Sequence, residues 1–320
     1  MHIIVVQFLS HFIQNVYSLG TKYGKIVGFK VPYNPLSFHP SVSSIQISYA
    51  RRDLTSNKVV VLTFGDGRKS QFTNAKPILD KYGFKASFFI VCNWVGLNSQ
   101  MSWQDIEQLH EEGHDIGSKT MSYKILTNLS PNALNYEIGQ SKQCLLDHGI
   151  NSTIFATPQG VGWDNATVIN TIAKYYKFAV NGFSSLMYLH CDGWGRISSQ
   201  TDCRTYFDNG TLTYANRYSI KEWSHNSNDI AYLHDDNIIF KKFVAEVNSQ
   251  NRFNKNGTIS AIPIIAYHNI ENNRYETFGT SDLNLFEAEM KYLYDNGFRV
   301  ITFSDLGYNG TSKYLYIKNS

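Results

Sequence analysis

Four polar residues stand directly after, or at the end of, segments that read as buried strands, and their side chains could do chemistry together. Asp66 and His268 are of the types that bind zinc and transfer protons. Lys119 and Tyr123 are not usual metal ligands, because an ammonium has no lone pair to donate and a phenol must first lose a proton with a pKa of about 10. Whether the four residues can act together depends on the elements that carry them.

Strand and helix signals alternate from Lys58 onward. The continuous apolar run 59–64 is typical of a strand that is buried on both faces. Between the strands, Ser102 is a good N-cap for a helix and Gly113 a good stop. The predicted strands are residues 59–64, 86–92, 114–118, 153–156, 178–181, 262–268 and 300–303. The predicted helices are residues 74–82, 103–112, 130–148, 165–176, 236–250 and 281–295, with a long irregular segment at 182–235.

Seven β-α units in one chain indicate an α/β fold, a distorted or incomplete (β/α) barrel of about seven parallel strands. Chemistry in such a barrel lies at the carboxyl ends of the strands, so we expect the residues found there to meet at one mouth. These residues are Gly65–Gly67, Asn93–Trp94, Lys119–Thr120 with Tyr123, Pro158–Gln159, Asn181 and His268–Asn269.

The strand ends resemble the motifs of the polysaccharide deacetylase family, the NodB homology domain of carbohydrate esterase family 4. The family's T-F-D-D-G appears as Thr63-Phe-Gly-Asp-Gly67. Its G-H-x-I-G-S is intact at 113–118, but the following H-[ST]-x-x-[HS] reads Lys119-Thr-Met-Ser-Tyr123. The third motif, R-x-P-[FY], reads Ala156-Thr-Pro-Gln159. The resemblance covers roughly residues 58–303.

The resemblance implies hydrolysis of N-acetyl groups on amino-sugar polysaccharides with zinc or a similar divalent ion. It places the metal at Asp66 and at two histidine positions, which Lys119 and Tyr123 occupy here. It places the base at Gly65, which has no side chain to accept a proton, and the acid at His268. General-base catalysis is worth about 10²–10⁴ in rate, so its loss is severe. We therefore expect no cofactor, or zinc or another divalent metal if other residues rebuild the site.

A compensating contact is predicted at the lost metal position. The ammonium of Lys119 would pair with Asp66 and supply the positive charge that a metal would have given. The alternative is that Lys119 points into solvent. Candidates for a substrate groove are Trp94, Pro158, Gln159 and Arg217, the last because Asn216-Arg-Tyr218 resembles a [DN]-R-Y-x-I stretch of some family members.

Composition excludes several classes of protein. The chain has 320 residues, 42% of them hydrophobic, and a net charge of +3, which excludes a disordered chain. With 29 basic and 26 acidic residues and no concentrated basic stretch, a dedicated nucleic-acid binder is not expected. No apolar run reaches about 18 residues, so no membrane-spanning helix is expected.

Residues 1–57 differ from the rest and are predicted to form an N-terminal extension, followed by a deacetylase-like domain at 58–320. The first 21 residues lack Asp, Glu, Lys and Arg. These residues alone favour a buried N-terminal helix or strand, and a degenerate signal or anchor is the alternative.

Cysteines and glycan acceptor sequences favour an extracellular or cell-surface location. Cys191 and Cys203 flank a short loop and could close it as a disulfide. Cys92 and Cys144 are predicted to be buried free thiols. Candidate glycosylation sites are Asn128, Asn151, Asn165, Asn209, Asn256 and Asn309.

The sequence therefore favours a catalytically degenerate deacetylase-like protein that binds a cell-surface glycan or other surface proteins. The alternatives are an active deacetylase with a rebuilt metal site and a purely structural surface component. Acetate release that stops with a chelator would distinguish the enzyme, and saturable glycan binding without turnover would distinguish the binding module.

Overall fold

The structure is a computed structural model that describes residues 56–162, 165–183, 186–189, 217–218, 220–225, 235–272, 279–311 and 314–318. The signal or anchor predicted within 1–21 and nearly all of the predicted extension 1–57 lie outside these residues, so both stay predictions.

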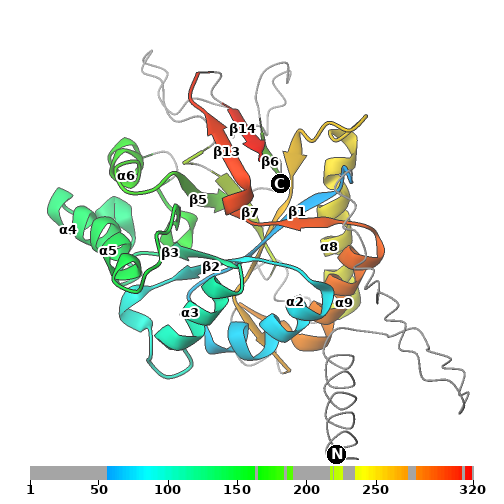
Figure 1. The fold of residues 1–320 in the computed structure, drawn as a ribbon, viewed down its shortest axis with the longest axis horizontal. Coiled ribbons are helices and arrows are strands. Elements are labelled where there is room, and N and C mark those ends of the chain that lie inside the picture. The colour runs from blue at the N-terminus through cyan, green and yellow to red at the C-terminus, as the bar shows by residue number, and fades with distance from the viewer. Residues whose placement is uncertain are drawn as a thin grey trace, which may run out of the picture. The chain divides into compact units, whose positions relative to one another are not determined.

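Among the described residues, parallel strands form a closed seven-stranded barrel (Figure 1), as the alternating pattern predicted. Pairing of β1 with β9 closes the ring, with Val61 opposite Ile264 and Phe64 opposite Tyr267. The order around the ring is β1 Val59–Phe64, β2 Ser87–Ile90, β3 Asp115–Ser118, β4 Ile154–Ala156, β5 Phe178–Phe183, β7 Ile220–Ser224 and β9 Ile264–Tyr267.

The membership of the ring differs from the prediction at two places. The segment predicted to be irregular, 182–235, contributes β7, which pairs with β5 and β9. The predicted last strand is β12 Arg299–Ile301, which pairs only with the first residues of β1 and lies beside the closed ring. Between Val180 and Phe183 the register of β5 with β7 shifts, so the pairing around the barrel is irregular at this point.

Every residue of β1 is buried, because the strand packs on both faces. Val59 and Val61 pack inside the barrel with Phe89, while Val60 and Leu62 pack outward against the surrounding helices. This two-sided burial explains why the strand reads as an unbroken apolar run.

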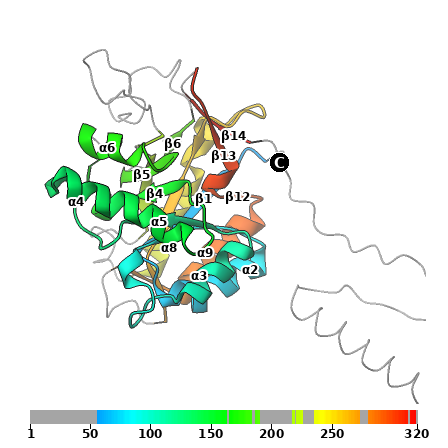
Figure 2. The same cartoon turned by 60° about the vertical axis from the view of Figure 1, so that its left-hand side comes forward.

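Helices surround the barrel in the views of Figures 1 and 2. Ser102 forms a reciprocal capping box with Asp105 at the start of α3, and Gly83, at φ 68°, ends α2. The helices are α2 Lys76–Tyr82, α3 Trp103–Glu111, α4 Pro131–Asn135, α5 Ser141–Leu146, α6 Ala166–Ile172, α8 Asp236–Asn248 and α9 Leu283–Asp295. A π-helical turn, Tyr136–Gln140, joins α4 to α5 without a break.

Short strand pairs complete the described chain. The antiparallel hairpin of β13 Leu306–Asn309 and β14 Tyr314–Ile317 contributes Leu306 and Leu315 to the apolar cluster that fills the barrel. The other pairs are β6 Met187–Tyr188 with β8 Ala261–Ile262 and β10 Asn269–Glu271 with β11 Thr280–Asp282. Within the described residues, no helix is both long and apolar enough to cross a membrane.

Candidate functional site

The candidate site lies where β1, β3 and β9 end. Gly65 and Asp66 follow β1, Lys119 follows β3, and His268 follows β9. The buried amide of Gln71 holds two of these ends together, because its Nε2 donates to the carbonyl of Gly65 at 2.5 Å and to that of His268 at 2.8 Å. The structure thus brings the predicted mouth residues of these strands together.

The predicted pair of Lys119 and Asp66 is confirmed. The Nζ of Lys119 lies 2.8 Å from Oδ1 of Asp66, and the two residues are only 7% and 6% exposed. The alternative, a lysine that points into solvent, is excluded by this burial. A buried carboxylate needs such a partner, because an uncompensated charge away from water is costly.

Gly65 leaves the space that the lysine uses. A Cβ placed on Gly65 would lie 2.9 Å from Nζ of Lys119 and 3.1 Å from Cδ2 of His268. Real Cβ atoms are essentially never found so close to a neighbour. The absence of a side chain at residue 65 and the presence of Lys119 are therefore matched features of one packing arrangement.

A second carboxylate, Glu222 on β7, lies inside the barrel near this pair. Its Oε2 accepts a hydrogen bond of 2.9 Å from Oγ1 of Thr63, which is two residues before Gly65 on β1. Glu222 was not predicted from the sequence, because β7 lacks the continuous apolar run of the other strands. The spacing of Ile220 and Glu222, two residues apart on one strand face, is the signal that could have found it.

Charges within the site shift the pKa of each member. Burial would raise the pKa of Asp66, but the charge of Lys119, its hydrogen bond and the other positive charges nearby together outweigh burial, and the pKa is lowered. Burial would lower the pKa of Lys119, but Asp66 holds it above its ordinary value. Burial raises the pKa of Glu222, with partial offset from Lys119. Burial and then the charge of Lys119 lower the pKa of His268 to about 4, so its imidazole is neutral at pH 7.

Aromatic rings and cations adjoin the ion pair. Tyr123 stacks on Trp94 with ring centroids 5.0 Å apart and planes 26° apart. Nζ of Lys119 lies 5.3 Å from the centroid of Tyr123, and the guanidinium of Arg68 lies 5.7 Å from that of Trp94. Tyr123 therefore contributes a packing surface for the lysine at a position where the resemblance implies a metal ligand.

The remaining groove candidates are placed differently from one another. Pro158 is buried directly after β4, and Gln159 beside it is exposed with a φ of 57°. Arg217 lies elsewhere: its carbonyl accepts from the amide of Ala179 near the amino end of β5, and its guanidinium lies 4.5 Å from the ring centroid of Tyr308. The prediction that Arg217 lines the groove is wrong, because the groove was expected at the opposite ends of the strands.

The residues at the mouth do not fit a catalytic zinc ion. Among the three positions where the resemblance implies ligands, only Asp66 offers a carboxylate or an imidazole. Its Oδ1 is already paired with the ammonium of Lys119. In the described part of the chain, no three His, Cys, Asp or Glu residues are grouped so as to hold a metal. His114 has a structural role, since its Nδ1 accepts a hydrogen bond from the amide of Ala86. His225 is buried with Glu289 at 2.6 Å and Ser281 at 2.8 Å.

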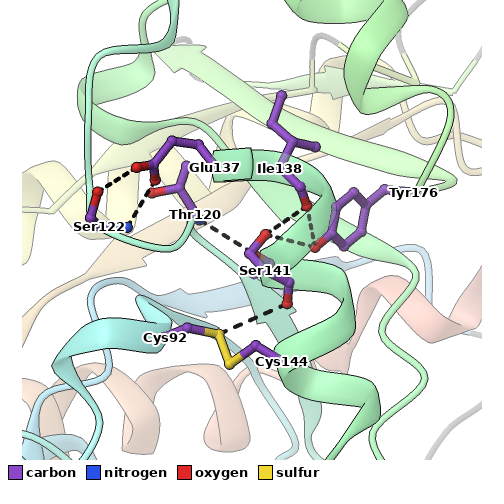
Figure 3. Close-up of a disulfide and its surroundings, with 9 residues drawn as sticks. Cys92, Thr120, Ser122, Glu137, Ile138, Ser141, Cys144 and Tyr176 are labelled. Carbon is purple, nitrogen blue, oxygen red and sulfur yellow. Dashed lines mark hydrogen bonds between the residues drawn. A yellow bond between two sulfur atoms is a disulfide. The ribbon is translucent and has the colours of Figure 1, made fainter. Parts of the chain in front are cut away.

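A disulfide joins Cys92, after β2, to Cys144 on α5 (Figure 3). The prediction of free thiols is wrong here, because the turn after β2 and the packing of α5 bring the two together across 52 residues. The predicted pair Cys191–Cys203 lies outside the described residues.

Three of the candidate glycosylation sites, Asn128, Asn151 and Asn256, are exposed. Asn165 and Asn309 are half-buried, and their side chains accept from backbone amides. Asn209 lies outside the described residues.

Comparisons with known proteins agree with this arrangement. The family model for polysaccharide deacetylase matches residues 52–179, the segment that carries β1 to β4 and the Asp66–Lys119 pair. This part of the chain therefore matches the polysaccharide deacetylase family. The chain is 28% identical over 123 residues to YxkH of Bacillus subtilis (strain 168). It is also 27% identical over 117 residues to a peptidoglycan-N-acetylglucosamine deacetylase of Bacillus cereus.

The shared regions are partial. The YxkH match covers 38% of this chain and 43% of YxkH, and the second match covers 36% of this chain and 52% of the Bacillus cereus protein. Among solved structures, a family 4 carbohydrate esterase from Streptomyces lividans, in complex with acetate, has a TM-score of 0.50 at 14% identity. That alignment covers 82% of this chain and 99% of the esterase, so the deacetylase barrel fold extends over most of the chain.

Proposed function

We propose that this protein is a catalytically inactive deacetylase-like barrel that works at the cell surface by binding a glycan or another surface protein. The observation that carries the proposal is the ammonium of Lys119, which lies 2.8 Å from the one retained metal-type carboxylate and against the position where Gly65 lacks a side chain. A cation that belongs to the chain occupies this centre, so no divalent ion is needed to compensate Asp66.

The positions of the general base and the general acid also lack groups that could transfer protons during hydrolysis. Gly65 cannot take a proton from water. His268 stands at the implied acid position, but with a pKa lowered to about 4 it is a neutral imidazole at pH 7 and not the imidazolium that would act as the acid. The two ends of a general acid–base mechanism are therefore absent together.

The surface location is supported by the Cys92–Cys144 disulfide, because stable disulfides belong to oxidising compartments. The exposed candidate glycosylation sites Asn128, Asn151 and Asn256 are compatible with such a compartment. The stacked rings of Trp94 and Tyr123 beside the mouth offer apolar, flat surface of the kind that glycans contact.

The test compares the wild type with a restored variant, Gly65→Asp/Lys119→His/Tyr123→His. Zinc is measured by elemental mass spectrometry, and acetate release is measured from N-acetylated oligosaccharides with and without a chelator. We expect neither zinc nor acetate for the wild type, and a gain of zinc for the restored variant. Adding Asp66→Asn to that variant is the matched control and should remove the gained zinc. Wild-type acetate release that a chelator abolishes would establish the active deacetylase instead.

A further inference from the structure

The mouth loop, residues 119–123, has a backbone that must be held in place by its surroundings. Thr120 and Tyr123 adopt left-handed conformations, with φ of 73° and 62°. Such values are uncommon outside glycine, and for a β-branched residue such as Thr120 they are a genuine outlier. Lys119 begins this loop and Tyr123 ends it, so the conformation of the loop sets the positions of both side chains in the site.

One side of the mouth loop is held by the turn after β2. The amide of Cys92 donates to the carbonyl of Thr120 at 3.2 Å, and the amide of Asn93 donates to that of Met121 at 2.9 Å. These bonds continue the pairing of β2 with β3 beyond the ends of the strands.

The other side is held by Glu137, in the helical turn between α4 and α5. Its carbonyl accepts from the amide of Met121 at 3.2 Å. Its carboxylate accepts from the amide of Ser122 at 2.8 Å and from the Ser122 hydroxyl (Figure 3). Glu137 is only 3% exposed, so its carboxylate oxygens rely on these donors for hydrogen bonds.

The disulfide links the two segments that hold the mouth loop, which are the turn after β2 and the helix that carries Glu137. Cys92 belongs to the turn after β2, and Cys144 lies two helical turns beyond Glu137 on the same continuous helix. We propose that the Cys92–Cys144 disulfide is a redox-sensitive clamp, which keeps the mouth loop in its left-handed conformation and so keeps Lys119 on Asp66. This inference extends the proposed function to a regulation of the same site.

Reduction has a defined chemistry and a defined point of attack. A dithiol supplies two electrons and two protons: its thiolate attacks one sulfur, breaks the S–S bond and forms a mixed disulfide. Its second thiol then closes the reagent into a cyclic disulfide and leaves Cys92 and Cys144 as thiols. Cys144 is half-buried whereas Cys92 is only 7% exposed, so the first attack falls on the Cys144 sulfur.

Hydrogen exchange of the full chain, oxidised and after treatment with dithiothreitol under native conditions, tests the clamp. A mass gain of two hydrogens per opened bond verifies reduction. At labelling times too short for α9 to exchange by global unfolding, we expect amide exchange in a peptide that spans the mouth loop to rise by about tenfold or more, while a peptide of α9 stays unchanged. The oxidised variant Glu137→Gln, which weakens the hydrogen bonds from Ser122 on the other side of the mouth loop, should speed exchange in the same peptide without any reductant.

Two results would overturn the clamp: unchanged exchange in the mouth loop after verified reduction, or an equal rise in α9, which would indicate general destabilisation. The double variant Cys92→Ala/Cys144→Ala should reproduce the reduced pattern without a reductant. Zinc in the untreated protein would end the proposed function without altering this exchange pattern, so the two failures are distinguishable.

Discussion

The ion pair at the barrel mouth makes a quantitative prediction for the change Lys119→Met. Methionine keeps an unbranched side chain but removes the charge, so Asp66 loses the counter-ion that lies 2.8 Å away. Removing one partner of a buried pair costs about 3–5 kcal/mol, because the remaining charge is uncompensated. We expect the free energy of unfolding to fall by this amount at pH 7, measured by urea denaturation with circular dichroism. A chelator in the buffer keeps stray metal from replacing the ammonium.

The pH dependence of this loss has a defined sign. In the wild type the pKa of Asp66 is lowered. The pair therefore stabilises the fold above the unfolded pKa of about 3.9, and this contribution is lost as the pH falls through the folded pKa. In the variant, burial without Lys119 raises the pKa of Asp66, so the carboxyl protonates at a higher pH. The difference in stability between wild type and variant should accordingly shrink on acidification.

Two comparisons decide whether the reasoning holds. The exposed pair of Lys291 with Asp295 on α9 provides a matched control, and Lys291→Met should leave the stability unchanged within error. Replacing both buried partners, as Lys119→Met/Asp66→Asn, should recover most of the lost stability. The reasoning is refuted if Lys119→Met costs no more than Lys291→Met, or if the double variant is as unstable as the single one.

Three further predictions follow from the site and the disulfide. Gly65→Asp alone should lower the free energy of unfolding by about 1–3 kcal/mol in urea denaturation, because its Cβ would approach Nζ of Lys119 to 2.9 Å. An NMR titration should give His268 a pKa of about 4 in the wild type and a higher pKa in Lys119→Met, because the lysine charge helps to lower it. Cys92→Ala/Cys144→Ala should cost about 4 kcal/mol, the loop-closure term for the 52-residue separation, measured by urea denaturation with the slope fitted for each variant.

The sequence predicted the parts of the site that follow apolar strands. The run Val59–Phe64 is buried on both faces, so its end marks Asp66 at the mouth. Lys119 could be paired with Asp66 in advance, because the resemblance places both residues at one metal position and their side chains carry opposite charges. The implied deacetylase barrel followed from the same positions.

The missed features depend on contacts between distant segments. β7 contains Lys221 and Glu222, so it lacks the apolar run of the other strands, and its inward carboxylate is accommodated by Thr63 of β1. The Cys92–Cys144 bond depends on how α5 packs beside β2, which residue spacing does not reveal. Both features depend on the folded barrel, so they could not be predicted from the sequence.

The contact between Gly65 and Lys119 also constrains mutational change in this protein. A side chain can return to residue 65 only if the ammonium of Lys119 moves away, because that nitrogen stands 2.9 Å from where the Cβ would be. Restoring residue 65 first therefore displaces the lysine, and replacing Lys119 first leaves Asp66 without a partner. Both single steps toward a deacetylase lower the stability of the fold, and this loss keeps the present site in place.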